Sequence, residues 1–152
     1  MTSLQWQTAS FGELGNLQLY AALRLRQEVF AVEQDSLYLD LDNVDQGAVH
    51  MLCWRQDELL AYQRCLPPGL TYTESGLGRI VVSAPARGQQ LGKELVQRGI
   101  AYNLQQWPEQ DIRINAQAYL QEYYERLGFT PVGGVYELDG IAHIYMLYRR
   151  SG

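Results

Sequence analysis

One segment restricts the fold more than any other: an apolar strand, a glycine-containing turn and a helix follow one another directly. Residues 78–83 contain three successive β-branched side chains, which is typical of a buried strand. A helix is expected over 89–106, where apolar residues recur at helical spacing until Pro108 ends the pattern. The chain is therefore expected to place the start of a helix beside the end of a buried strand.

The start of that helix has the chemistry of a phosphate-binding site. The first turn of a helix leaves up to four N–H groups unpaired and carries partial positive charge. Glycines let a ligand approach the backbone closely, and Arg87 and Lys93 add cationic donors. The segment 87–93 therefore fits a diphosphate, although a helix start with solvated charges explains the same residues.

Two nucleotide-binding motifs do not match this segment. A triphosphate-binding loop needs four residues between its glycines, whereas three residues separate Gly88 from Gly92. Glu94 also stands where that motif carries the Ser or Thr that binds Mg²⁺. The G-x-G-x-x-G pattern of dinucleotide-binding folds is absent from the strand-to-helix turn.

The remaining periodicity predicts a mixed sheet with helices packed on it. Further strands are expected over 4–8, 49–55, 59–66, 112–116, 129–137 and 141–148, and further helices over 11–32 and 119–127. Ser10 and Glu13 form a capping-box pattern at the start of the first helix. The order predicts an α/β fold in a single domain over 1–152, with a mostly antiparallel central sheet and one β-α-β crossover.

Composition and charge exclude several classes of function. The chain has 152 residues, of which 47% are hydrophobic and 19% charged, so it can bury a core without a metal or disulfide. Its 12 basic and 17 acidic residues give a net charge of −5, which disfavours a nucleic-acid or anionic-membrane binder. No apolar run reaches the roughly 20 residues of a membrane span, and the N-terminus lacks a signal-peptide pattern. We therefore expect a cytoplasmic protein.

The two cysteines lie in consecutive expected strands. A turn over 56–58 places Cys53 opposite Tyr62 and Cys65 opposite His50, so the thiols are not expected to face each other. Two cysteines alone indicate neither a disulfide framework nor a cysteine zinc site.

Two motifs make the chain similar to the Gcn5-related N-acetyltransferase (GNAT) superfamily. The segment Arg87-Gly-Gln-Gln-Leu-Gly92 resembles the acyl-CoA motif Gln/Arg-x-x-Gly-x-Gly/Ala, and Tyr124-Glu-Arg-Leu-Gly-Phe129 resembles the family's last helix. Gln90 replaces the middle glycine of the first motif. We therefore expect a side chain near the phosphates, while the backbone amides remain available.

Further segments resemble the ElaA-like branch of this superfamily. They are 26–34, 38–42, His50, 116–118, 129–131 and 137–146, so that the resemblance covers nearly the whole chain. In that branch Cys-Pro is expected after the Val-Glu-Gln segment, where this chain has Ser36-Leu37. A role for that cysteine does not transfer to this chain.

The resemblance implies a GNAT-like fold and a donor site. Acetyl-CoA or another acyl-CoA would be the cosubstrate, and the acyl group would pass directly to an amine of a small molecule or peptide. The residues that the resemblance assigns to acyl-CoA are Ile80, Val81, Val82, Arg87, Gly88, Gln89, Gln90, Gly92, Lys93 and Gln117. The strands 80–83 and 112–117 are expected to splay around the reacting carbonyl, helped by a bulge near Val81 or Val82.

Three residues are candidates for catalysis. Tyr124 stands where the family carries a tyrosine that protonates the leaving thiolate, although it also fits an aromatic core position. Glu33 belongs to the loop that lines the acceptor pocket in this fold, where it could orient an amine or accept its proton. The imidazole of His143 could act as a base near neutral pH, although a histidine in a strand is more often a structural residue. Gln117 either contacts the pantetheine or caps the following helix.

The stretch 33–48 is acidic and has no steady period, so it is expected to be a loop. Its Asp40, Asp42 and Asp45 either attract a cationic acceptor or form a solvated surface. His50, His143 and this loop match no mononuclear ligand spacing, so no metal is expected.

Two classes of function stay open. The first is an acyl-CoA-dependent N-acyltransferase, and the second is a non-catalytic acyl-CoA-binding or protein-interaction module, which Gln90 favours. Turnover with an amine would separate them. The sequence identifies neither the acceptor nor the acyl chain length. Dimers are common in the family that the chain resembles, but no apolar stripe in this sequence defines a dimer interface.

Overall fold

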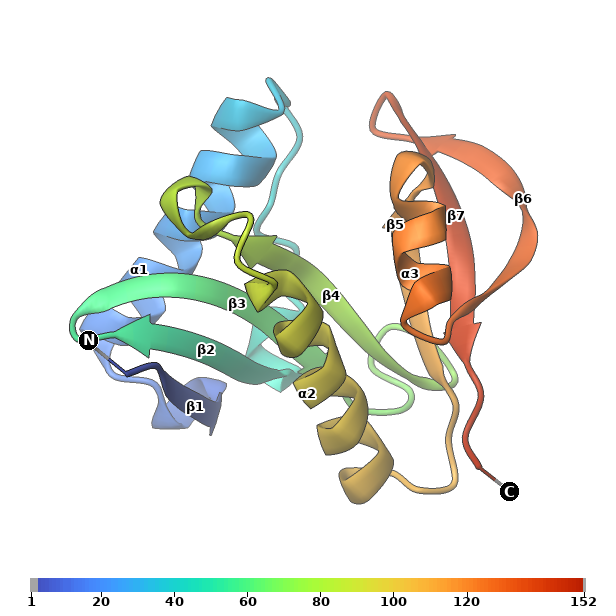
Figure 1. Cartoon of the computed structure of the whole chain (residues 1–152), viewed down its shortest axis with the longest axis horizontal. Coiled ribbons are helices and arrows are strands. Elements are labelled where there is room, and N and C mark those ends of the chain that lie inside the picture. The colour runs from blue at the N-terminus through green and yellow to red at the C-terminus, as the bar shows by residue number, and fades with distance from the viewer. Residues whose placement is uncertain (1–2, 152) are drawn as a thin grey trace.

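The computed structural model describes residues 3–151, which form a seven-stranded mixed sheet with helices on both faces (Figure 1). The strands are β1 (Gln5–Ser10), β2 (Val49–Arg55), β3 (Glu58–Leu66), β4 (Ser75–Val82), β5 (Ile112–Gln117), β6 (Thr130–Leu138) and β7 (Ile141–Tyr148), in the order β1-β2-β3-β4-β5-β7-β6. The helices are α1 (Asn16–Arg26), α2 (Leu91–Gln106) and α3 (Gln121–Arg126), with shorter pieces η1 (Phe11–Glu13), η2 (Gln27–Glu33), η3 (Asp45–Gly47), η4 (Ala84–Ala86) and η5 (Ala118–Leu120). The predicted α/β fold is confirmed.

Two clusters of buried side chains hold the helices on opposite faces of the sheet. Leu95 and Ile100 of α2 belong to one cluster, and Leu25 of α1 belongs to the other. Gly99 lets α2 approach β3 closely, because a Cβ at this position would come within 2.5 Å of Gln63 Nε2. That nitrogen donates to the Leu95 carbonyl at 2.7 Å, which ties α2 to the strand.

The only parallel pair among the described strands joins β4 to β5, and it is short. Ser75 pairs with Ile112 and Gly76 with Arg113, and beyond these positions the two strands diverge (Figure 1). The expected splay is therefore present. The diverging part of β4 leads directly into η4 and the start of α2.

A bulge in β4 accompanies this divergence. Tyr62 of β3 faces Val81, while Arg64 faces Gly78, so β4 carries one extra residue between these pairs. Arg79 within this bulge has a φ of 49°. The predicted bulge near Val81 is therefore present, and the structure places it at 79–80, directly before Val81, which stays in register with β3.

The predicted helix over 11–32 is present only from Asn16 onward, where α1 continues directly into η2, and η1 at 11–13 is a separate short turn. The capping box belongs to η1, where the Glu13 carboxylate accepts the Ser10 N–H at 2.8 Å. The last piece, η2, is a π-helix, and the N–H of Gln34 donates to the Val29 carbonyl at 3.1 Å. Such wide turns are rare and are often found at functional sites.

The β2–β3 hairpin is present, but its register differs from the prediction. A shift between Cys53 and Trp54 places Cys53 opposite Ala61 and Cys65 opposite Val49. The irregularity adds a residue that the sequence pattern does not reveal. Both thiols are buried and free, and the prediction that they do not face each other is confirmed.

Candidate active site

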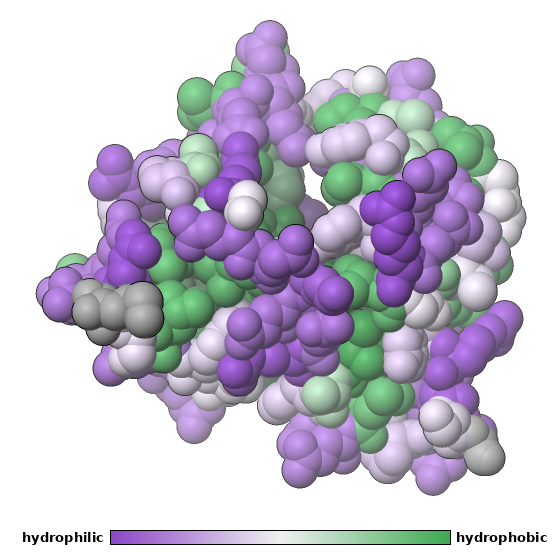
Figure 2. Space-filling model, viewed as in Figure 1, coloured by the Kyte–Doolittle hydropathy of each residue, from purple (hydrophilic) through white to green (hydrophobic). Residues whose placement is uncertain are grey.

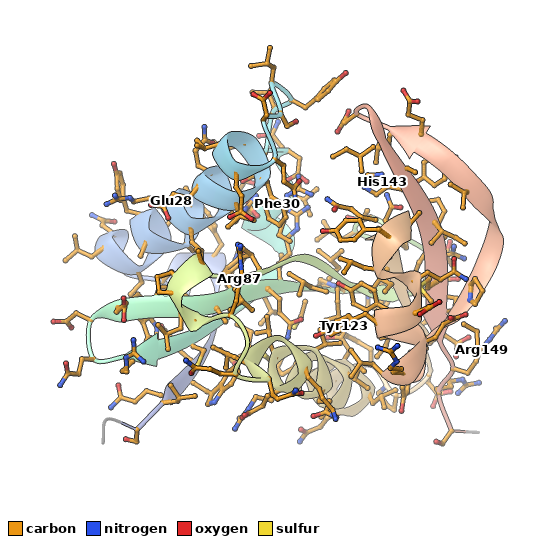
Figure 3. All side chains as sticks on the ribbon, turned by 45° about the horizontal axis from the view of Figure 1, so that its top comes forward. Glu28, Phe30, Arg87, Tyr123, His143 and Arg149 are labelled. Carbon is orange, nitrogen blue, oxygen red and sulfur yellow. The ribbon has the colours of Figure 1, made fainter. Side chains whose placement is uncertain are left out.

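A pocket of about 300 Å³ lies where β4, η4, the start of α2 and α3 meet. Its lining residues are Val82, Ala86, Arg87, Gly88, Gln90, Leu91, Gly92, Lys93 and Tyr123. Arg87 and Tyr123 lie on opposite sides of it (Figure 3). The pocket therefore brings together most of the segment expected to bind a diphosphate, whereas Ile80, Val81 and Gln89 lie outside its lining.

The floor of the pocket is the N-terminus of α2. The first bond within the helix runs from the Glu94 N–H to the Gln90 carbonyl at 3.2 Å, so the preceding N–H groups have no partner inside the helix. Gly88 has a φ of 83° and open space around its missing side chain, which lets a ligand approach the backbone. With Arg87 and Lys93 beside these amides, the site has the donors and charge that a diphosphate requires.

Gln90 occupies the backbone conformation that glycine adopts most easily. Its φ and ψ are 65° and 11°, in the left-handed region, and it immediately precedes α2. This conformation explains why a glycine is expected at the position in the motif, since a Cβ there is strained. Gln90 nevertheless adopts it with its side chain exposed.

The three successive β4 residues have different surroundings. Val82 borders the pocket, Ile80 is partly buried on the α2 side, and Val81 is buried on the α1 side. The Val82 carbonyl accepts a hydrogen bond from Arg87 Nε at 3.1 Å. Because β5 has diverged here, the β4 edge toward β5 is left without a strand partner among the described residues.

Glu33, which was expected on the acceptor side, is paired with Arg87 of the turn before α2. Arg87 Nη1 and Nη2 donate to Glu33 Oε2 and Oε1 at 2.8 and 2.9 Å. The hydrogen bond from Arg87 lowers the pKa of the Glu33 carboxyl below its usual range. A carboxylate with a lowered pKa is a poor proton acceptor at neutral pH, so Glu33 is suited to binding positive charge.

Tyr124 lies in the core rather than in the pocket wall. It is 6% exposed, and its ring packs edge to face against Tyr123 and Phe129. Burial raises the pKa of its hydroxyl well above the ordinary value, which keeps the proton on the oxygen. The residue that lines the pocket is its neighbour Tyr123, which the sequence analysis did not assign to the site.

Gln117 and His143 lie at the far side of the splay. They face each other in the β5–β7 pairing, and Gln117 Nε2 donates to Gln34 Oε1 at 3.2 Å. The Gln117 side chain makes no capping bond to η5, so the helix-capping alternative is not supported. His143 Nδ1 is 2.8 Å from the Ile141 carbonyl, and in the tautomer that donates this bond Nε2 carries a free lone pair.

The surface is notched between the end of α1 with η2 on one side and α3 with β7 on the other (Figure 2). The Gln34–Gln117 bond joins the segment after η2 to the end of β5 across this region. The splay, the pocket at the start of α2 and His143 thus belong to one part of the molecule (Figure 3).

The three aspartates of the acidic stretch are neutralised by arginines and do not form a free acidic surface. Arg26 binds Asp40 and Asp45, Arg64 binds Asp42 and Asp45, and Arg79 binds Asp40 and Asp42. The guanidinium of Arg26 is fully buried. The aspartates were expected either to attract a cationic acceptor or to form a solvated surface, and both expectations are wrong. Three arginines balance the three aspartates and hold residues 40–45 against the sheet.

This arginine–aspartate cluster could have been suspected from the sequence. Arg26 and Arg64 interrupt apolar helix and strand patterns, and the acidic stretch lies between them in the chain. A buried arginine requires a carboxylate partner.

His50 is a structural residue beside the cluster. Its Nδ1 is 2.6 Å from the Tyr62 hydroxyl and its Nε2 is 2.9 Å from the Asp45 carbonyl. Burial lowers its pKa.

Residues 3–151 contain no group of three His, Cys, Asp or Glu side chains arranged to hold a metal ion. None of the helices in that range is long and apolar enough to cross a membrane.

A mixed sheet that splays at its parallel pair, beside a pocket at the start of a helix, defines an acyl-CoA N-acyltransferase fold. The chain belongs to the GNAT acetyltransferase family, since the model of the "Acetyltransferase (GNAT) domain" matches residues 15–150. The predicted resemblance is confirmed at the level of family and of the ElaA-like branch.

Similar proteins cover nearly the whole chain. Protein ElaA of Escherichia coli K12 is 41% identical over 145 residues, which span 94% of this chain and 95% of ElaA. An acyl-CoA N-acyltransferase from Pseudomonas aeruginosa has a similar structure, with a TM-score of 0.91, 40% identity, and 98% and 100% of the two chains covered. The crystal structure of E. coli ElaA also matches with a TM-score of 0.91 and 39% identity, over 97% of this chain and 100% of that one.

Proposed function

We propose that this protein transfers an acyl group, most simply acetyl, from acyl-CoA directly to an amine of a small molecule or peptide. One observation carries the proposal: β4 and β5 pair at two positions and then diverge beside a pocket floored by the start of α2. This arrangement offers a diphosphate seat and an open strand edge in one continuous site.

The donor is held at its two ends by backbone groups. The amides at the start of α2 bind the diphosphate, with Lys93 supplying charge. The free edge of β4 beside Val82 hydrogen-bonds the pantetheine arm as a neighbouring strand would. Gln117 positions the segment after η2 through its bond to Gln34.

The reaction forms a C–N bond and breaks a C–S bond. The nitrogen lone pair of a neutral amine attacks the thioester carbonyl, and N–H groups on the free edge of β4 stabilise the developing oxyanion. Tyr124, which stays protonated because burial raises the pKa of its hydroxyl, gives its proton to the leaving sulfur. His143 Nε2 accepts the proton that the amine loses, and exchange with solvent restores both residues.

The alternative function, a module that binds acyl-CoA without turnover, rested on Gln90. The left-handed backbone of Gln90 removes the main reason to expect a distorted loop. The retained pocket and splay favour the enzyme.

The test is a transfer assay with acetyl-CoA and a panel of primary amines and peptides. The measurements are CoA thiol release and the mass of the acylated product. The proposal expects CoA release that depends on the amine, together with a product heavier by one acyl group. Binding of acetyl-CoA without release for any amine in the panel would support the module instead.

A further inference from the structure

Each guanidinium nitrogen of Arg87 donates a hydrogen bond to the protein itself. Its Nη1 and Nη2 bind both oxygens of Glu33, and its Nε binds the Val82 carbonyl at 3.1 Å. Arg87 comes from the turn before α2, whereas Glu33 ends η2, so the ion pair joins two segments that are 54 residues apart. Figure 3 shows Arg87 below the helix that carries Glu28 and Phe30.

The same guanidinium lines the donor pocket. The Arg87 side chain is 41% exposed, so an incoming anion can reach it. The planar fork of arginine suits a carboxylate and a phosphate equally well. A diphosphate seated on the α2 amides therefore competes with Glu33 for Arg87.

Glu33 differs from the other carboxylates of its region. Asp40, Asp42 and Asp45 are held by Arg26, Arg64 and Arg79 of the cluster, which does not line the pocket. Glu33 is 47% exposed, and its neighbour Gln34 contacts Gln117 at the end of β5. When Arg87 turns to a phosphate, Glu33 is left as an unpaired negative charge beside the splay.

We propose that the Glu33–Arg87 ion pair is a latch that couples the two substrate sites, so that donor binding at Arg87 frees Glu33 to bind a cationic acceptor. This inference rests on the proposed function. Donor and acceptor then bind with positive cooperativity, and each strengthens the binding of the other by the same factor.

The latch also indicates the class of acceptor. A carboxylate stays ionised at neutral pH and cannot hold the proton that the reacting nitrogen must lose. The charge that Glu33 binds therefore persists through the reaction, on a second cationic group of the acceptor. The acceptor is an amine that carries another positive charge, such as a diamine.

Calorimetric titration with CoA tests the latch without any transfer, because CoA carries no acyl group. Glu33→Gln frees Arg87 and should bind CoA about two- to fivefold more tightly than the wild type, since exposed ion pairs contribute little individually. Glu28→Gln is the matched control. Glu28 is an exposed carboxylate in the same η2 segment, and it pairs with Arg24, which lies outside the pocket. It should leave CoA affinity unchanged.

A second titration measures the coupling. Saturating CoA should raise the affinity of the wild type for 1,4-diaminobutane at least about fivefold, and much less for 4-amino-1-butanol, which lacks the second charge. Glu33→Gln should abolish this increase, and Glu28→Gln should keep it.

Either of two results overturns the latch: a Glu33→Gln affinity for CoA equal to that of Glu28→Gln, or no effect of CoA on diamine binding by the wild type. An equal effect of CoA on both amines overturns the second-charge assignment. A wild type that does not bind CoA at all refutes the proposed function as well, so the two failures are distinguishable.

Discussion

Tyr123 and Tyr124 are neighbours in α3 whose rings meet edge to face, with centroids 5.2 Å apart and planes at 80°. Tyr123 lines the donor pocket, and a Cβ at Gly92 would come within 3.2 Å of its hydroxyl. Tyr124 lies behind it, between Tyr123 and Phe129. The two hydroxyls therefore have different surroundings. Tyr123 lines the pocket, and the proton donation proposed for Tyr124 requires its hydroxyl to reach the thioester sulfur from behind Tyr123.

Replacing Tyr124 by Phe should lower turnover by at least about tenfold, because a positioned general acid contributes roughly 10²–10⁴ to rate. The affinity for acetyl-CoA should change by less than about threefold, since phenylalanine keeps the packing of the ring. Initial-rate kinetics and calorimetry measure the two effects. Tyr123→Phe is the matched control and should keep most of the turnover. Unchanged turnover in Tyr124→Phe would remove this residue from the mechanism.

Gln90→Gly tests whether the missing motif glycine has weakened the donor site. Gln90 already has a φ of 65°, so glycine should leave the direction of the amides unchanged. We expect the affinity for acetyl-CoA to change by less than about threefold. Gln90→Val should weaken binding more, because a β-branched residue is strained at positive φ. A gain of tenfold or more in Gln90→Gly would show that the glutamine impairs the site.

The arginine–aspartate cluster should contribute strongly to the stability of the fold around residues 40–45. Asp45→Asn leaves the buried Arg26 and Arg64 short of a charged partner, and removal of one member of a buried ion pair costs about 3–5 kcal/mol. Urea unfolding measures this loss. Glu58→Gln removes the exposed Arg55–Glu58 pair and should cost less than about 1 kcal/mol. Equal losses in both variants would contradict the structural role of the cluster.

The same cluster predicts how stability depends on acid. Burial would raise the pKa of Asp42, but the hydrogen bond and charge of Arg64, together with Arg79, outweigh it and lower the pKa to about 2. Because the folded value lies below the unfolded one, the contribution of Asp42 is complete above about pH 4 and is lost as the pH falls toward 2. Asp42→Asn should therefore flatten the decline in unfolding free energy over this range. An unchanged slope would count against the ion pairs of Asp42.

The fold could be predicted from the sequence where local signals decide the structure. The apolar run before Ser83 and the helix ended by Pro108 define the crossover. The divergence of β4 from β5 was expected only because the resemblance to the GNAT superfamily implied it. Local signals fail where a single residue is inserted. The exact position of the bulge at 79–80 and the register shift after Cys53 are set by contacts with neighbouring strands, which the spacing of apolar residues does not reveal.

The same distinction applies to the candidate site: residues that are close together in the sequence could be predicted, whereas contacts between distant segments could not. Residues 87–93 are consecutive in the chain, and all of them except Gln89 line the pocket at the start of α2. The Glu33–Arg87 pair joins distant segments, and exposed charges at such separations carry no sequence pattern. The role of Tyr123 was missed because Tyr123 and Tyr124 look alike in sequence, and only the orientation of α3 decides which one faces the pocket.

The central claim, that the start of α2 binds acyl-CoA, is tested most directly by thermal unfolding with acetyl-CoA, CoA or ATP. A ligand at a hundredfold excess over its Kd stabilises the folded state by about 2.7 kcal/mol, which raises the Tm of a chain of this size by about 5–10 °C. Gly88→Glu places a negative side chain at the diphosphate seat, and Gly69→Glu is the control. Gly69 has a similar φ of 85° and equally open surroundings, but it lies outside the pocket.

We predict a rise in Tm with acetyl-CoA and CoA, little with ATP, loss of the rise in Gly88→Glu and its retention in Gly69→Glu. No rise with millimolar CoA in the wild type, or an equal rise in both glycine variants, would contradict a donor site at residues 87–93.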